Sequence, residues 1–345
     1  MNNFDLKPVP QPEARELKKR FKWRWWEILI VILVGAFIIE AIYFYVVFAQ
    51  TKKKIFQPRT SATSLVANIG VPKNSLVVDK KNEYQNYTTF LLMGIGGEGH
   101  AGGGLADSIQ VLVLNNKNNE LKIISVPRDL YLRLDECGMA KINEMDQCGT
   151  RLWGENGGGD FSKSIVSQVL GMPINYYVKM DFEGFKELIN LVGGVDVDVE
   201  KAINDQLAGL NIVAGRTHMD GELALAYART RYTDSDFDRS GRQQKIILAV
   251  KDRLLSSDIY LNPFKLYKIL SVISDNLVTD LSSDTTFSYL KKSQDFNTAG
   301  TYVIDNRKDN LLYSTTSEAG SYILLPVAKD FSEIWAKVKR IIIDK

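Results

Sequence analysis

The chain is predicted to be an α/β protein with a mixed central β-sheet covered by helices on both faces, preceded by one transmembrane helix. From residue 87 onward, short apolar runs alternate with helical patterns, which favours a mixed sheet between helices. An unbroken apolar stretch near the N-terminus favours the membrane helix. We expect a cytoplasmic tail (residues 1–27), the transmembrane helix (28–49), an extracellular linker (50–86) and one extracellular domain (87–345).

Residues 28–49 are almost wholly apolar and, at about 1.5 Å per residue, are long enough to cross a hydrocarbon core of roughly 30 Å. A signal peptide is the alternative, but its apolar core would be shorter, and no small-residue cleavage site follows Phe48. Glu40 lies near mid-span, where an acid is expected to be protonated or shielded by a partner. Basic residues are denser before the span than after it, so the span is expected to be a signal anchor in the cell membrane with the N-terminus in the cytoplasm.

Residues 50–86 mix polar residues and single prolines without sustained periodicity, as a linker does. The runs TTFLLMGI, IQVLVLN, LKIISVP, YYVKM and VDVDV then predict strands, and FSKSIVSQVLG, FEGFKELINLVG and QQKIILAVKDRLLS predict amphipathic helices. Gly171 and Gly193 follow two of these helices, as C-terminal caps do. Further on, LYKILSVISDNLVTDLS and DTTFSYLKK predict helices, and GSYILLPV predicts a late strand.

Composition argues against nucleic acid as a partner and leaves two alternatives for the cysteines. The chain has 43 Lys and Arg against 41 Asp and Glu, so there is no global basic field. Cys137 and Cys148 lie in the external part, where an oxidising environment favours a disulfide. A metal pair is the alternative; the two histidines of the chain are not near these cysteines in sequence.

The stretch RTRYTDSDFDRSGRQQ is dense in arginines. If ALAYARTRY is a strand, its period of two places Arg229 and Arg231 on one face. One face of the helix that follows carries Arg239, Arg242 and Gln243. Arginines near a helix N-terminus oppose its partial positive charge, so an anion between the two groups would resolve the conflict. Guanidinium groups suit phosphate oxygens, so we expect a di- or polyphosphate; a solvated surface of Arg–Asp pairs is the alternative.

Two further elements are candidates for the same ligand. In ISVPRDLYL, Arg128 and Asp129 follow an apolar strand, and strand ends are where α/β sheets bind ligands; a plain surface ion pair is the alternative. The stretch GIGGEGHAGGGLADS carries Asp107 near its end, and its successive amides could form an anion-binding concavity. It lacks the Gly-Lys-Ser/Thr ending of a nucleotide-binding P-loop. If it is only an exposed hairpin loop, Glu98, His100 and Asp107 are incidental.

In their order along the chain, these motifs resemble those of the LytR-CpsA-Psr family of cell-envelope proteins. The resemblance runs from about Thr88 to the C-terminus. It covers the loop ending in A-D-S, then SVPRD, KIN, INYYVKMDFEGFKELINLVGGVDVDV, and finally G-E-x-A-L-A-Y-x-R-x-R with DFDRSGRQQ. It implies the α-β-α fold of that family. It also implies a phosphotransferase that moves a glycopolymer from a polyprenyl-pyrophosphate carrier to peptidoglycan through a phosphodiester bond.

The resemblance also implies roles for single residues. The groups expected to grip the pyrophosphate are Arg128, Arg229, Arg231, Arg239, Arg242 and Gln243. Arg128 and Asp107 are expected catalytic residues, with Mg²⁺ as cofactor and Asp107 as a metal ligand. Asp129 is also expected to be catalytic: either Asp129 or Asp107 takes the proton of the acceptor hydroxyl, or Asp129 orients Arg128. The family's G-x-D motif reads Gly94-Ile95-Gly96 here, so a usual metal ligand is missing, and Glu98 is the candidate replacement.

Two other functions remain open at this point. The same arginines could hydrolyse polyprenyl pyrophosphates with water as acceptor, or the domain could bind lipid-linked glycans or wall polymer without turnover, as a regulator. Phosphoryl transfer needs charge neutralisation and positioning more than covalent help from the protein, and arginines with Mg²⁺ supply both. The transferase is therefore the favoured prediction.

Overall fold

The computed structural model describes residues 83–343, with gaps at 135–136, 155–156, 207–209, 232–234, 263, 266–267 and 270–275. The predicted tail, the predicted transmembrane helix and the predicted linker up to residue 82 lie outside the described residues. Within the described part, no helix combines the length and the hydropathy that membrane crossing requires.

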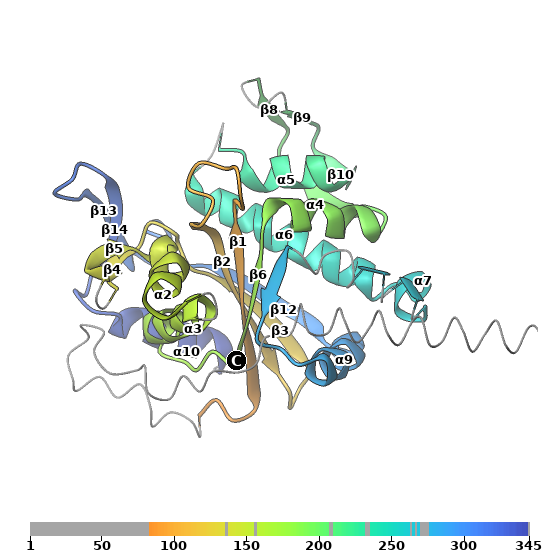
Figure 1. Cartoon of the computed structure of the whole chain (residues 1–345), viewed down its shortest axis with the longest axis horizontal. Helices are drawn as coiled ribbons and strands as arrows, with labels where there is room; N and C mark the ends of the chain where they lie inside the picture. The colour runs from red at the N-terminus through yellow and green to blue at the C-terminus, as the bar shows by residue number, and fades with distance from the viewer. Residues whose placement is uncertain are drawn as a thin grey trace, which may run out of the picture. The chain divides into compact units, whose positions relative to one another are not determined.

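A six-stranded mixed sheet forms the centre of the domain, as predicted (Figure 1). Its strand order is β11-β6-β1-β2-β3-β12. The pairs β1–β6 and β3–β12 are parallel, and the other neighbours are antiparallel. The strands are β1 (Tyr87–Ile95), β2 (Ala106–Asn115), β3 (Glu120–Ser125), β6 (Tyr176–Met180), β11 (Leu277–Thr279) and β12 (Asn297–Val303).

Helices cover both faces of the sheet because the buried strands are apolar on both sides. In β1, Leu91 and Met93 belong to the core shared with α2, α3 and α10, whereas Phe90 and Leu92 pack in the core that includes α6 and α9. The helices are α2 (Met145–Trp153), α3 (Gly157–Leu170), α4 (Phe182–Leu191), α5 (Gly221–Arg229), α6 (Asp236–Leu254), α7 (Ser257–Tyr260), α9 (Ser283–Lys292) and α10 (Ser332–Ile342). Figure 1 shows the α2–α3–α10 group and α6 on opposite sides of the sheet.

Helices α4, α5 and α6 form a second core with a small sheet of β7 (Val195–Val199) and β10 (Gly215–Met219). The predicted strand VDVDV is thus confirmed, with alternate residues buried, although it lies outside the central sheet. Three hairpins complete the described elements: β4 (Tyr131–Arg133) with β5 (Met139–Lys141), β8 (Ile203–Asp205) with β9 (Leu210–Ile212), and β13 (Leu312–Thr316) with β14 (Tyr322–Pro326). Short 3₁₀ turns cover Ile142–Glu144 and Ser293–Asp295.

Local signals explain where several helices stop and start. Gly171 and Gly193 follow α3 and α4 with φ of 65° and 83°, the left-handed conformation that a helix-ending glycine adopts, so both predicted caps are confirmed. At the other end of α4, the side chain of Asp181 accepts a hydrogen bond from the Gly184 amide at 2.8 Å.

Two sequence predictions of secondary structure are wrong. ALAYARTRY is not a strand: α5 runs to Arg229 and buries Ala224, Tyr227 and Ala228 in the second core. The Asp220 side chain caps its start by accepting from the Leu223 amide at 2.9 Å. The helical pattern LYKILSVISDNLVTDLS contains a strand instead at Leu277–Thr279, which pairs with β6; most of the preceding residues lie outside the described ones. Tertiary pairing overrode the local periodicity there.

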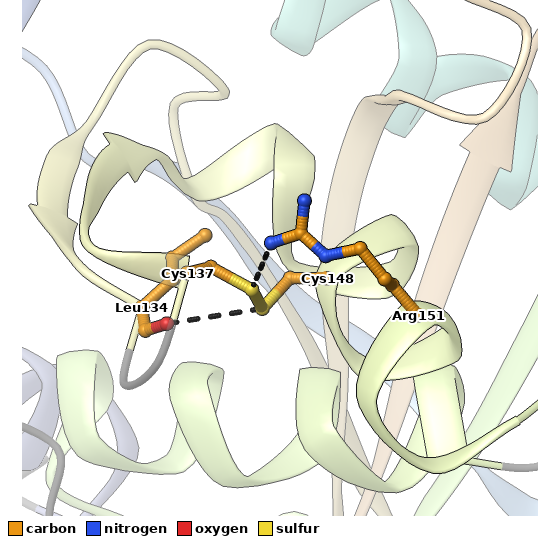
Figure 2. Close-up of a disulfide and its surroundings, with 4 residues drawn as sticks. All are labelled: Leu134, Cys137, Cys148 and Arg151. Carbon is orange, nitrogen blue, oxygen red and sulfur yellow. Dashed lines mark hydrogen bonds between the residues drawn. A yellow bond between two sulfur atoms is a disulfide. The ribbon is translucent and has the colours of Figure 1, made fainter.

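The two cysteines form a disulfide, as favoured from the sequence (Figure 2). Cys137 lies between β4 and β5, and Cys148 lies on α2, with their Cα atoms 6.2 Å apart. The Arg151 guanidinium donates to the Cys137 sulfur at 3.0 Å, and the Cys148 sulfur lies 3.7 Å from the Leu134 carbonyl oxygen. The bond therefore ties the β4–β5 hairpin, which carries Lys141, to the helix layer.

Candidate active site

A cavity of about 570 Å³ lies between the central sheet and helices α4, α5 and α6. One wall follows α6 from Arg239 through Gln243, Ile246 and Val250 to Leu254. These residues span 15 positions, or about 22 Å of helix. Most of the remaining lining is apolar, and over half of these apolar residues come from β1, β6 and α4. The cavity is thus a long apolar slot with a polar end.

Arginines gather at the polar end of this slot. Arg128 lies in the turn after β3, Arg229 in the last turn of α5, and Arg231 just after it; Arg239 lies in the first turns of α6. Asp107, near the start of β2, lines the same end. Segments far apart in sequence therefore bring together five of the predicted site residues.

Asp236, the first residue of α6, connects three of these arginines. Its Oδ1 lies 2.8 Å from Arg239 Nη2, 3.2 Å from Arg231 Nη2 and 3.5 Å from Arg128 Nε. Burial raises the pKa of the Asp236 carboxyl, while the charges of Arg239 and Arg128 act to lower it. Burial also lowers the pKa of Arg239. Sequence reasoning missed Asp236, although its spacing of three from Arg239 places both on one helix face.

Asp107 holds the other side of Arg128. Its carboxylate accepts a hydrogen bond from Arg128 Nη1, and its backbone carbonyl accepts one from Arg239 Nη2 at 3.2 Å. The Asp107 side chain remains 38% exposed, which leaves it accessible to a ligand. Arg128 is thus held between Asp107 and Asp236.

Asp129 lies behind Arg128 rather than in the cavity lining. Its Oδ1 accepts a hydrogen bond from Lys141 Nζ at 2.7 Å, and its Oδ2 lies 3.8 Å from Arg128 Nε. Lys141 belongs to the KIN motif, so that motif supplies the counter-ion of Asp129. This arrangement suits orientation of Arg128 better than proton transfer.

The structure does not bring Arg242 to the cavity lining, in contrast to its predicted role as a pyrophosphate ligand. Its guanidinium donates to the backbone carbonyls of Tyr227, at 3.1 Å, and Thr230. It therefore holds the segment between α5 and α6, which carries Arg231. The spacing of three residues predicted that Arg239 and Arg242 share one helix face. The spacing could not show that Arg239 lines the cavity whereas Arg242 is buried against α5.

Gln243 does line the cavity, and a second glutamine fixes its orientation. Gln110 Nε2 donates to Gln243 Oε1 at 3.2 Å and to Ser125 Oγ at 3.1 Å. The Gln243 amide nitrogen makes only a long contact of 3.4 Å to the Ala228 carbonyl oxygen. Its N–H groups are therefore the part left for a ligand.

Within the part of the chain that the structure describes, four buried polar atoms around this end have no hydrogen-bond partner: Arg128 Nε, Arg239 Nε, Asp236 Oδ1 and Gln110 Oε1. Arg128 Nε and Asp236 Oδ1 lie within ion-pair distance of charged neighbours but form no hydrogen bond. Buried polar atoms are rarely left unpaired, so such a group is typical of a binding site. The two unpaired donors, Arg128 Nε and Arg239 Nε, suit an anion with several acceptor oxygens, whereas Asp236 Oδ1 and Gln110 Oε1 would accept from a donor.

Glu98 lies in the exposed part of the glycine-rich loop and is not among the cavity-lining residues. Within the described ranges, no cluster of three or more His, Cys, Asp or Glu is suited to hold a metal ion. Asp107 is a carboxylate of the cavity lining that remains accessible beside the arginines. A Mg²⁺ ion fits beside it only if oxygens of the substrate and waters complete its shell, as is common for this cation.

Comparison with known proteins indicates the class of enzyme, because curated relatives of the chain are transferases. The chain belongs to the LytR-CpsA-Psr family, because the model of the LytR_cpsA_psr family matches residues 42–340. The resemblance drawn from the sequence motifs is thereby confirmed.

Two relatives and one solved structure illustrate the match. The polyisoprenyl-teichoic acid–peptidoglycan teichoic acid transferase TagV of Bacillus subtilis (strain 168) is 37% identical over 220 residues, 61% of this chain and 52% of that protein. The transferase TagU of Bacillus anthracis is 31% identical over 285 residues, 81% of this chain and 85% of TagU. The crystal structure of B. subtilis TagV has a TM-score of 0.57 at 28% identity, covering 74% of this chain and 96% of that one. The chain thus spans about half of the curated TagV sequence and most of TagU.

Proposed function

We propose that this protein transfers a glycopolymer from a polyprenyl-pyrophosphate carrier to peptidoglycan through a phosphodiester bond, while tethered to the cell membrane by residues 28–49. The observation that carries the proposal is the continuity of one cavity: its wall follows α6 for about 22 Å, from a polar end with four arginines to an apolar part at Ile246, Val250 and Leu254. An isoprenoid chain requires the apolar part of the cavity, and a pyrophosphate requires the arginines at its polar end. The activities of TagU and TagV, teichoic acid transfer to peptidoglycan, fit the same ligand.

The arginines would neutralise the pyrophosphate during the reaction. The acceptor hydroxyl oxygen forms a bond to the phosphorus that bears the glycan, and the bond from that phosphorus to the bridging oxygen breaks. Polyprenyl monophosphate leaves with the electron pair. Arg128, Arg231 and Arg239 are positioned to donate to the phosphate oxygens, where charge develops. Gln243 adds an oriented amide at the same end.

A carboxylate would take the proton of the acceptor hydroxyl. Asp236 is our candidate: it lies directly behind the lining, within 3.5 Å of Arg128, Arg231 and Arg239, so movement of these arginines onto the phosphate oxygens would free its carboxylate. Burial also raises its pKa, which makes it a better base than an ordinary aspartate. Asp129 is paired with Lys141 and orients Arg128 instead. Asp107 would hold Mg²⁺ together with phosphate oxygens, and the ion would supply further charge neutralisation of the leaving phosphate.

The test uses the full chain in detergent micelles with a polyprenyl-pyrophosphate-linked glycan, Mg²⁺ and peptidoglycan. We expect glycan bound covalently to peptidoglycan and an equal amount of polyprenyl monophosphate. Release of glycan phosphate into water without attachment would favour the hydrolase instead. Tight binding of the carrier with no turnover would favour a non-catalytic regulator.

A further inference from the structure

Phe182 lies where the apolar wall of the cavity meets the arginines. It is the first residue of α4 and lines the cavity. The Arg229 guanidinium carbon lies 4.4 Å from the centre of its ring, which is cation–π distance. The His100 ring meets the same phenyl ring nearly perpendicularly, at 5.2 Å between centroids and 89° between planes. Phe182 thus contacts the glycine-rich loop, α5 and the cavity at once.

Arg229 differs from the other arginines of the site in what holds it. Arg128, Arg231 and Arg239 all lie within ion-pair distance of Asp236. Among the residues that the structure describes, Arg229 has no carboxylate within that distance, and the phenyl ring is its contact. A ring face attracts a guanidinium without neutralising its charge and leaves its in-plane N–H groups available. Among the described residues, no nearby carboxylate therefore offsets the positive charge of Arg229 beside the slot.

The glycine-rich loop is shaped to approach α4 closely enough for the His100 contact. A Cβ atom at Gly97, where φ is +84°, would lie 2.9 Å from the Asp181 Cβ. A Cβ atom at Gly103 would lie 2.0 Å from the Gly97 carbonyl oxygen. Both positions exclude side chains, and the Gly97 amide donates to the Gly103 carbonyl at 3.0 Å. The loop can rest on the start of α4 because these residues are glycines.

We propose that Phe182 is a positioning residue that holds Arg229 for an anionic ligand at the mouth of the slot. The proposal rests on the pyrophosphate site described above and deepens it. The ring orients the guanidinium so that its N–H edge faces phosphate oxygens, and His100 limits movement of the ring from the loop side. Loss of the aromatic face should weaken anion binding while the apolar wall survives.

The experiment measures binding of inorganic pyrophosphate, and separately of the uncharged isoprenoid farnesol, to the full chain in detergent by calorimetry. Phe182→Leu should weaken pyrophosphate binding by about 3- to 10-fold, the range expected for one cation–π contact, and leave farnesol binding within twofold. Phe182→Tyr keeps an aromatic face and should restore pyrophosphate binding. Tyr313→Leu is the control: Tyr313 is an aromatic residue 45% exposed on β13 and outside the cavity lining, and this variant should bind pyrophosphate and farnesol like the unaltered chain.

A double variant separates positioning from a general packing effect. Arg229→Ala should weaken pyrophosphate binding at least as much as Phe182→Leu, and the combined variant should resemble Arg229→Ala alone, because the ring acts through that arginine. Two outcomes overturn the inference alone: unchanged pyrophosphate binding by Phe182→Leu, or effects that multiply in the double variant. Unchanged binding by Arg229→Ala would instead count against the arginine site and hence against the proposed function.

Discussion

Asp236 Oδ1 lies 2.8 Å from Arg239 Nη2, and the same oxygen lies within 3.5 Å of two further arginines, Arg231 and Arg128. Burial and the charges of Arg239 and Arg128 act on the Asp236 carboxyl in opposite directions, and burial is the larger effect, so the pKa is raised. A raised carboxyl pKa means that the folded state retains its proton to higher pH than the unfolded chain does. The contribution of Asp236 to stability is therefore greatest in acid.

The Asp236→Asn variant tests this sign. Relative to the variant, the unaltered protein should lose stability as the pH rises from the ordinary aspartate pKa of about 3.9 through the raised value, by about 1.4 kcal/mol for each tenfold difference in proton affinity between the folded and unfolded states. Urea unfolding of both proteins across this pH range measures the difference. A relative stability that increases with pH would mean that the arginines outweigh burial.

Transfer activity of the Asp236→Asn variant should fall at least about tenfold, since the candidate base is gone.

Arg128→Ala and Arg231→Ala should reduce transfer by roughly 10²- to 10³-fold, the usual effect of removing a donor that stabilises developing charge. Their folds should persist, because both side chains lie at the cavity rather than in an apolar core. Arg216→Ala is the control: Arg216 is 74% exposed on β10 and pairs with Asp196. Initial rates and circular dichroism give the comparison. Rates for Arg128→Ala or Arg231→Ala equal to that of the control would remove that arginine from the mechanism.

Asp107→Asn should raise the Mg²⁺ concentration needed for half-maximal transfer by at least about tenfold, the order of effect expected when a metal site is impaired. Glu98→Gln should leave the Mg²⁺ titration unchanged, because Glu98 lies outside the cavity lining. Activity titrated with Mg²⁺ in both variants is the measurement. A shift in Glu98→Gln alone would restore Glu98 as the replacement metal ligand predicted from the sequence.

Replacing both cysteines by alanine should lower the free energy of unfolding by about 2–3 kcal/mol, because the bond closes a short loop of the unfolded chain, 11 residues in sequence separation. The β4–β5 hairpin carries Lys141, the partner of Asp129, so activity should decline at temperatures where the fold persists. Denaturant unfolding with and without a reductant provides the measurement, and the alanine variant should not respond to the reductant. Equal stability of both proteins would show that the packing of the hairpin suffices.

Apolar runs predicted the central strands and the main helices because burial on both faces leaves a strong pattern in sequence. The pattern failed at ALAYARTRY. Its nine residues fit either a strand or a helix, and the structure has a helix that Asp220 caps. It failed again at Leu277–Thr279, where pairing with β6 supplies the strand. A local pattern carries no information on such a distant partner.

For the candidate site as well, local motifs predicted part of the arrangement and long-range packing determined the rest. Motif order identified Arg128, Arg229, Arg231, Arg239 and Asp107 as residues of one site, and all five line the cavity. Motif order did not distinguish Arg242, whose carbonyl partners depend on the turn after α5. Phe182 lies in a predicted amphipathic helix, and the helical pattern gave no sign of its cation–π contact, which depends on how α4 and α5 pack.

The acids among the arginines have a consequence for selectivity. Before any substrate arrives, Arg128, Arg231 and Arg239 already share the Asp236 carboxylate. Ligand binding is therefore an ion exchange, in which an incoming anion must compete with the Asp236 carboxylate for the arginines. A singly charged anion offers little more than the carboxylate it displaces, whereas a diphosphate brings several oxygens and more charge. Small monovalent anions should therefore compete weakly with the Asp236 carboxylate for these arginines.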